Sequence, residues 1–133
     1  MRKGVMFLIY QNGKFLLEKR RDDDKRAPGL VIIPSGNQEE NETPEETLKR
    51  EIKEELGVTP KTWELLDVFK NVALNGDAFY TNAYLVTEVD GDIVHQEPDE
   101  SEHLWATPEE ADKLIELSGF RLPLFKALAI VKK

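Results

Sequence analysis

Residues 36–58 of the chain read GNQEENETPEETLKREIKEELGV, and the second half of this segment predicts a helix with well-marked ends. Thr43 is a typical N-cap residue, a proline follows it at the first helical position, and Glu46 completes a capping box. Gly57 suits the left-handed position that follows a helix. The sequence therefore predicts a helix over residues 44–56.

The predicted helix carries an acidic cluster beside its apolar face. At about 100° per residue, with Leu48 at zero, Ile52 and Leu56 fall at about 40° and 80°. The adjoining arc, at about 300°, 240° and 340°, holds three glutamates: Glu51, Glu54 and Glu55. These like charges repel one another, and the last two also oppose the helix dipole. A hard divalent cation such as Mg²⁺ would neutralise the cluster; the alternative is an acidic face covered by water.

Other charged residues of the same helix have different predicted roles. Arg50 can reach Glu51 and Glu54, but one guanidinium does not balance three carboxylates. Glu45 and Glu46 lie in the first turn, where the helix dipole favours negative charge, so we interpret them as structural.

The composition sets outer limits on function. With 133 residues, 40% of them apolar and 33% charged, the chain fits a single domain over residues 1–133. The absence of cysteine excludes disulfides, thiolate zinc sites and a cysteine nucleophile. The net charge of −8 disfavours binding of a nucleic acid polymer, because phosphate contacts need Lys and Arg. Metal ions would mediate any contact with phosphates; otherwise the charge serves only solubility.

The sequence carries no signal for a membrane or export segment. No apolar run approaches the ~18 residues that are needed to cross a bilayer. The first apolar run, residues 5–10, is shorter than a signal peptide requires. We expect this run to form a buried strand and the protein to be cytoplasmic.

Apolar runs and turn signals alternate along the chain. Asn12-Gly13 is typical of a tight hairpin. The pattern predicts a loop over residues 34–42 and strands over residues 5–10, 14–19, 30–33, 62–71, 78–89 and 103–106. A second helix is predicted to open at Thr107 and end near Gly119, and a third to run from about Pro123 to Lys132. This order favours a mixed α/β (α+β) domain with a β-sheet sandwiched between α-helices.

The segment from Gly36 to Val58 resembles the signature of the Nudix hydrolases, a family that includes MutT-like enzymes. That signature is a Gly, five residues, a Glu, seven residues, then Arg-Glu-apolar-any-Glu-Glu-any-Gly-apolar. All nine constrained positions match here, over 23 of the 133 residues, with Glu42 as the first glutamate. The resemblance implies a Nudix fold in which the motif forms a loop, a helix and a second loop.

The resemblance also implies roles for the motif residues. Four groups match the metal ligands of the family: the side chains of Glu51, Glu54 and Glu55 and the carbonyl of Gly36. Arg50 matches an arginine that holds the catalytic glutamates in place, and Glu42 matches a mainly structural glutamate. The expected cofactor is Mg²⁺, with Mn²⁺ able to substitute.

The region before the signature departs from the family's usual pattern. Family members often read Gly-any-Trp-any-any-Pro-Gly-Gly, whereas this chain has Val31 in place of the Trp and Ser35 in place of the first Gly of the pair. These changes bear on packing and on the substrate pocket. Arg20 ends a strand like one in the family and is either a contact to substrate phosphate or an exposed surface arginine.

Several aromatic residues could stack on a nucleobase or belong to the core instead. Phe79 and Tyr80 point to opposite faces of a strand, so they cannot both line one pocket. We assign Phe79 to substrate binding and leave Phe7 and Tyr84 as further candidates. Trp105 is expected in the core.

The implied reaction is attack of water on a phosphorus atom of a P–O–P linkage, and it needs a base. The candidates are Glu54 itself and three carboxylates of an acidic loop: Glu97, Glu100 and Glu102. The sequence does not choose among them. His95 and His103 are weaker candidates for the base, since a lone histidine near a strand end is usually structural.

Small single-domain members of the Nudix family often resemble nucleoside triphosphate pyrophosphohydrolases, so the resemblance favours an enzyme that releases a nucleoside monophosphate and pyrophosphate. ADP-ribose, dinucleoside polyphosphates and a non-catalytic nucleotide-binding regulator are the alternatives. A nucleotide-like small molecule is the expected partner, and the protein is either a monomer or a homodimer.

Overall fold

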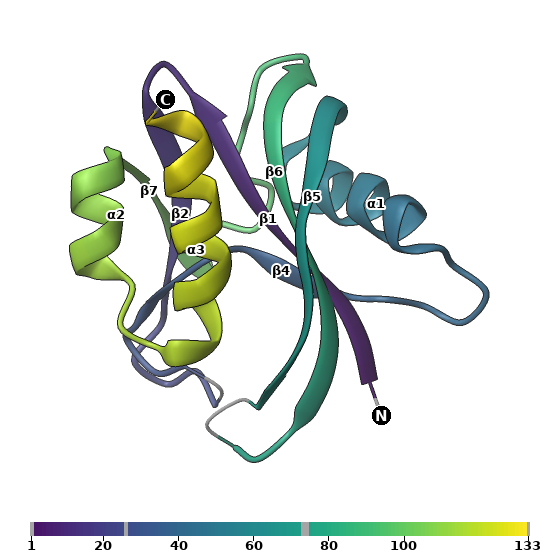
Figure 1. Ribbon diagram of the computed structural model, residues 1–133. Helices are drawn as coiled ribbons and strands as arrows, with labels where there is room; N and C mark the ends of the chain where they lie inside the picture. Colours follow the sequence, from purple (N-terminus) through teal and green to yellow (C-terminus); the bar gives the residue numbers. More distant parts are fainter. Residues whose placement is uncertain (1, 26, 73–74, 133) are drawn as a thin grey trace.

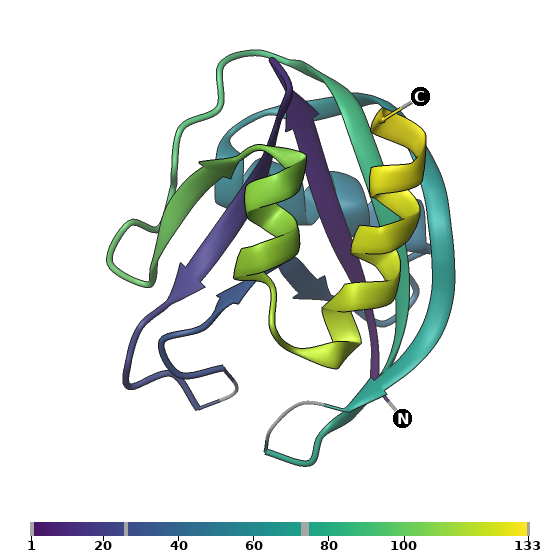
Figure 2. The ribbon, with the colours of Figure 1, turned by 60° about the vertical axis from the view of Figure 1, so that its left-hand side comes forward.

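A computed structural model describes residues 2–25, 27–72 and 75–132. The strands are β1 (Arg2–Gln11), β2 (Lys14–Arg20), β3 (Val31–Ile32), β4 (Ser35–Asn37), β5 (Thr59–Val72), β6 (Ala78–Asp90) and β7 (Ser101–Ala106). The helices are α1 (Pro44–Leu56), α2 (Pro108–Leu114) and α3 (Ser118–Val131). The predicted mixed fold with a sheet between helices is confirmed, with α1 on one side of the sheet and α2 and α3 on the other (Figures 1 and 2).

The sheet is mixed because β1 pairs in parallel with β6 and antiparallel with β2. Its order is β3-β2-β1-β6-β5, with β4 added to β1 and β7 added to β2. Asn12 and Gly13 join β1 to β2 with φ angles of 52° and 77°, as the two central residues of a type I′ hairpin turn require. The predicted hairpin is therefore confirmed.

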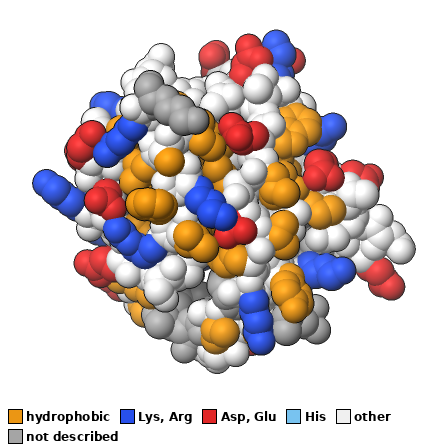
Figure 3. Space-filling model, in the orientation of Figure 1, with side chains coloured by type: hydrophobic (Ala, Val, Ile, Leu, Met, Phe, Trp, Pro, Cys, Tyr) orange, Lys and Arg blue, Asp and Glu red, His pale blue; other side chains and the backbone are white. Residues whose placement is uncertain are grey.

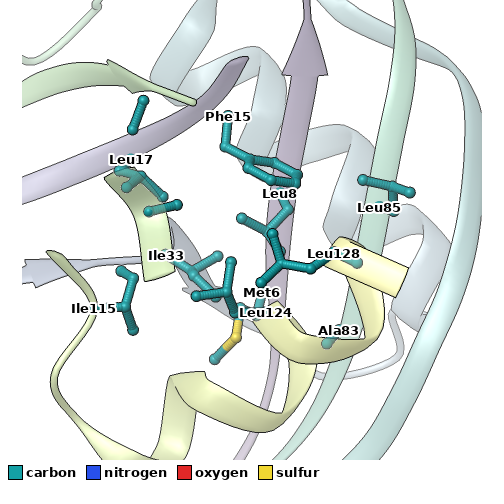
Figure 4. Close-up of a cluster of buried hydrophobic side chains, with 13 residues drawn as sticks. Met6, Leu8, Phe15, Leu17, Ile33, Ala83, Leu85, Ile115, Leu124 and Leu128 are labelled. Carbon is teal, nitrogen blue, oxygen red and sulfur yellow. The ribbon is translucent and has the colours of Figure 1, made fainter. Parts of the chain in front are cut away.

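Two apolar cores lie on the two faces of the sheet. Residues that alternate along β1 point to opposite faces, so Met6 and Leu8 enter one core while Phe7 enters the other. Figure 4 shows the first core, where Leu124 and Leu128 of α3 lie over the sheet together with Ile115, which follows α2. The second core contains the predicted apolar face of α1: Leu48, Ile52 and Leu56, each with 0% exposure.

The bounds and caps of α1 agree with the sequence prediction. The Thr43 side chain accepts a hydrogen bond from Glu46 N, the Glu46 side chain accepts one from Thr43 N, and Gly57 ends the helix at φ 72°. The capping residues in the sequence thus predict both ends of α1 correctly.

We expect Thr43→Ala to lower the free energy of unfolding by about 1 kcal/mol, since the cap satisfies an otherwise unpaired amide of the first turn. Thr43→Ser is the matched control, because it keeps the hydroxyl oxygen that accepts the bond. Urea unfolding of both variants measures the effect. Equal stability of Thr43→Ala and the parent chain would contradict the role of the cap.

The prediction of an unbroken loop over residues 34–42 is wrong. β4 pairs antiparallel with β1, with Gly36 opposite Val5. A three-residue strand of Ser, Gly and Asn has little intrinsic strand preference, and its partner lies far away in the sequence. The pairing places Gly36 in the sheet and close to α1.

The predicted bounds of the last two helices are also wrong. α2 ends at Leu114, and the buried Ile115 leaves the helix to form a parallel bridge with Val31. α3 begins at Ser118 and contains Pro123 in its interior. Proline there removes one backbone bond, but burial of Pro123 and the apolar residues after it holds the helix together.

Several large apolar side chains are exposed. Trp105 is 40% exposed, so its predicted place in the core is wrong. Leu122 and Phe125 of α3 are 49% and 69% exposed, and in Figure 3 the apolar side chains of this face are interspersed with charged ones. Among the described residues, no helix has the length and apolar character needed to cross a membrane.

Candidate active site

Arg50 is the centre of a hydrogen-bonded network on α1. Its Nε and Nη2 donate to the two carboxylate oxygens of Glu42, at 2.7 and 3.0 Å, and Nη2 also donates to Asn37 O at 2.7 Å. Its Nη1 donates to Glu51 at 2.8 Å and lies 3.4 Å from Glu54. The hydrogen bonds to Arg50 and to Glu39 N lower the pKa of Glu42 to about 2. Arg50 therefore ties the loop before α1 to the acidic face of the helix.

The three motif glutamates lie in different environments. The Glu51 side chain is 12% exposed and that of Glu54 is 53% exposed, while Glu55 is half-buried. Burial raises the pKa of Glu51. Burial also raises the pKa of Glu55 to about 9, and the nearby carboxylates of Glu18, Glu51 and Glu97 add to the rise. Because of this burial and these neighbouring carboxylates, Glu55 keeps its proton at neutral pH.

Gly36 lies directly against the Glu51 carboxylate. A Cβ atom at this position would overlap with the Glu51 side chain. Only glycine leaves this space, so β4 can bring its backbone carbonyls next to the acidic face of α1. The contact gives a steric reason for glycine at position 36 of this chain.

Arg20 is a partly buried member of an ion-pair network and not an exposed surface arginine. Its side chain is 26% exposed; Nη1 lies 2.7 Å from Glu18 and Nη2 lies 2.6 Å from Asp24. Asp24 also accepts a hydrogen bond from Ala27 N and so orders the loop after β2. Arg20 and Glu18 both line the cavity beside Glu51.

The cavity has a volume of about 500 Å³ and a mixed lining. Its polar lining includes Arg20, Glu51 and Gly36. Its apolar lining comes from β1, β3, β6 and the start of α3: Met6, Ile32, Phe79, Leu117 and Phe120. A ligand with a charged part and a flat apolar part would match both kinds of lining.

The structure places the predicted aromatic residues as their strand positions require. Phe79 lines the cavity and is 7% exposed, whereas Tyr80 points to the other face and is 48% exposed. Phe7 is fully buried in the second core. Tyr84 is buried too, and its hydroxyl donates to Glu45 at 2.9 Å.

The acidic loop packs against the end of α1. Gln96 N donates to Glu55 O at 2.9 Å, which places Glu97 next to the helix. Glu100 is exposed at the turn before β7. In the pairing of β2 with β7, Glu102 lies opposite Lys19, and Glu18 lies opposite His103. Neighbouring pairs point to opposite faces of the sheet, so the Glu102 side chain lies on the other face from that of Glu18.

The donors of this site suit a hard divalent cation, because they are carboxylate and carbonyl oxygens. Over residues 2–25, 27–72 and 75–132, no three His, Asp or Glu side chains are already arranged to hold a metal ion. Glu51 and Glu54 are both turned toward Arg50, so their carboxylates would have to rotate to share one ion.

Comparison with known proteins decides the family. The model of the NUDIX domain matches residues 1–128. The chain belongs to the Nudix hydrolase family. Nudix hydrolases generally use divalent metal ions, in agreement with the oxygen-rich site on α1.

Solved Nudix structures share the fold over almost the whole chain. The MutT NUDIX hydrolase of Burkholderia pseudomallei has a TM-score of 0.79 and 30% identity, covering 94% of this chain and 96% of that one. The E. coli ORF135 protein has a TM-score of 0.77 and 26% identity, covering 99% of this chain and 91% of that one.

Curated relatives with named activities match to different extents. An ADP-ribose pyrophosphatase of Methanocaldococcus jannaschii is 41% identical over 64 residues, 48% of this chain and 37% of that protein. The nucleoside triphosphatase NudI of Enterobacter is 46% identical over 50 residues, 38% of this chain and 36% of that protein. The chain thus spans little more than a third of these two relatives. The CTP pyrophosphohydrolase of E. coli is 27% identical over 96% of this chain and 91% of that protein.

Two parts of this Nudix site do not follow from the motif. The sequence does contain a signal for Glu18 as a site residue. Side chains two positions apart in a strand point to the same face, so Glu18 shares a face of β2 with Arg20, which was already a candidate. The apolar wall formed by Leu117 and Phe120 had no local signal, since it depends on how α3 packs against the sheet.

Proposed function

We propose that the protein hydrolyses a P–O–P linkage in a nucleotide with the help of Mg²⁺ or Mn²⁺. A nucleoside triphosphate is the favoured substrate, and the products are a nucleoside monophosphate and pyrophosphate. The supporting observation is the cavity of about 500 Å³, which is lined both by motif residues and by aromatic and aliphatic side chains. Its size suits a small-molecule ligand.

The metal would be held by oxygen atoms of α1 and β4: the carboxylates of Glu51, Glu54 and Glu55 and the carbonyl of Gly36. When bound, a divalent cation neutralises phosphate oxygens and lowers the pKa of an attacking water. Arg50 keeps the backbone of Asn37 and the side chain of Glu51 together, and it would give up part of its contact with Glu51 and Glu54 when their carboxylates turn toward an ion.

The remaining tasks fall to Arg20, which lines the cavity, and to a base near the end of α1. The Arg20 guanidinium is in position to meet a phosphate in the cavity, where it would exchange part of its contact with Asp24 or Glu18 for the substrate. Glu97 is the favoured base among the loop carboxylates, because its neighbour Gln96 is bonded to the backbone of Glu55. It would take a proton from the water that attacks phosphorus. Glu54 remains the alternative base.

An ADP-ribose substrate is the second candidate. The segment that is 41% identical to the M. jannaschii ADP-ribose pyrophosphatase favours it. ADP-ribose also contains a P–O–P linkage, so the same polar residues of the cavity would serve. The two candidates differ in what the rest of the cavity has to accept.

A substrate screen tests the proposal. The protein is incubated with the common nucleoside triphosphates, ADP-ribose and dinucleoside polyphosphates, with Mg²⁺, with Mn²⁺ or with EDTA, and the products are identified. We expect metal-dependent release of a nucleoside monophosphate together with pyrophosphate from a triphosphate. Turnover of ADP-ribose but of no triphosphate, with release of ribose 5-phosphate, would favour the second candidate. The absence of turnover with either metal would contradict the proposal that the protein is an enzyme.

The role of the apolar wall can be tested at Phe79. We expect Phe79→Leu to raise KM about five-fold with little change in kcat, because the flat ring is replaced while the volume is nearly kept. Tyr80→Leu is the matched control, since its side chain points to the opposite face of the same strand. Steady-state kinetics on the best substrate gives both constants. An equal change in KM for Phe79→Leu and Tyr80→Leu would contradict a role of Phe79 in substrate binding.

A further inference from the structure

His95 joins the two ends of the acidic loop. Its Nδ1 lies 3.1 Å from Glu97 N, and its Nε2 lies 2.9 Å from Ser101 O. A backbone amide can only donate and a carbonyl can only accept. The ring is therefore the neutral tautomer with its proton on Nε2, and it links the start of the loop to the start of β7.

A second histidine supports this ring. His103 of β7 stacks on His95 with a centroid distance of 3.5 Å and an angle of 5° between the planes. Burial, together with the neighbouring His95, lowers the pKa of His103 to about 4. The His103 ring is thus suited to the uncharged form.

The loop is also fastened to the helix that carries the motif. Val94 N donates to Leu56 O at 3.0 Å and Gln96 N donates to Glu55 O at 2.9 Å. His95 lies between these two bonds. The hydrogen bonds of His95 and of these two amides together fix the position of the Glu97 backbone relative to Glu55.

We propose that His95 is a positioning residue, which holds the acidic loop closed so that Glu97 faces the acidic end of α1. This inference rests on the proposed function, because Glu97 is the favoured base there. The hydrogen bond from Glu97 N to His95 Nδ1 orients the backbone from which the Glu97 side chain extends. His95 itself touches no reacting group.

Kinetics of paired variants tests the proposal. We expect His95→Phe to lower kcat about ten-fold and to leave KM within two-fold, because the stack is kept and both ring nitrogens are lost. His95→Asn should recover part of kcat, since its side-chain oxygen can accept the Glu97 amide. Val94→Ala is the matched control in the same loop: its side chain is 59% exposed, and its backbone bond to α1 is kept.

A double variant separates positioning from general loss of structure. If His95 acts through Glu97, then His95→Phe combined with Glu97→Gln has the same kcat as Glu97→Gln alone. Losses that multiply would overturn the proposal, and so would full activity of His95→Phe.

Nitrogen NMR of the free protein gives a readout that does not depend on activity. Nδ1 of His95 is expected without a proton and Nε2 with one, and the Glu97 amide should exchange slowly with solvent in the parent chain and quickly in His95→Phe. The opposite tautomer would overturn the proposal even if the enzyme is active. An inactive parent chain with the expected tautomer and exchange would overturn the proposed function and leave the loop closure supported.

Discussion

Glu54→Gln is expected to lower kcat by at least roughly 100-fold, the scale of a lost metal ligand or base. Glu54 has the most exposed carboxylate of the three motif glutamates, so it can turn toward a metal and substrate. The amide of glutamine keeps the shape but binds a hard cation weakly. Steady-state kinetics with saturating Mg²⁺ measures the loss.

The same substitution should leave the metal-free fold intact. It removes a weak ion pair with Arg50 at 3.4 Å, but it also relieves repulsion from Glu51 and an unfavourable contact with the helix dipole. We expect a change within about 0.5 kcal/mol in the free energy of unfolding. Glu64→Gln, at an exposed position of β5, is the control for removal of one negative charge. Full activity of Glu54→Gln would refute the assignment of Glu54.

Local signals were enough to predict the helix and its acidic face. The capping box at Thr43 and the glycine at residue 57 set the ends of α1, and helical spacing placed Glu51 next to the buried face. The hairpin at residues 12 and 13 was equally local, because its turn type depends only on two positive φ angles. Features of this kind are encoded within a few neighbouring residues.

The rest of the site depends on contacts between distant segments. Phe79 reaches the cavity because β6 pairs in parallel with β1, where Phe79 lies opposite Arg2. The start of α3 reaches it because Ile115 leaves the preceding helix for a bridge with Val31, an event with no signature in the sequence around it. Proline is favoured at the first position of a helix, so the sequence around Pro123 predicted that the last helix begins there. α3 begins at Ser118 instead, because packing of the helix on the sheet outweighs this local preference.

Glu55→Gln is expected to stabilise the metal-free protein at pH 7.5 and to have no effect near pH 4. The pKa of Glu55 is raised from an ordinary 4.5 to about 9 by burial and by neighbouring carboxylates. Below pH 4.5 the carboxyl keeps its proton in both the folded and the unfolded chain, so it makes no difference to stability. As the pH rises toward 9, only the unfolded chain loses the proton, and the folded state becomes progressively less favoured.

Urea unfolding in EDTA at several pH values measures this effect. The expected gain at pH 7.5 is about 2 kcal/mol, less than the full linkage value because the side chain keeps some contact with water. Mg²⁺ should stabilise the parent chain more than the variant, since only the parent has an ionisable carboxylate there for the cation to bind. A difference between the two chains that does not vary from pH 4 to pH 8 would contradict the buried, protonated carboxyl. Ionisation of the buried Glu55 carboxyl is unfavourable in the metal-free folded protein, and a bound cation would offset this cost.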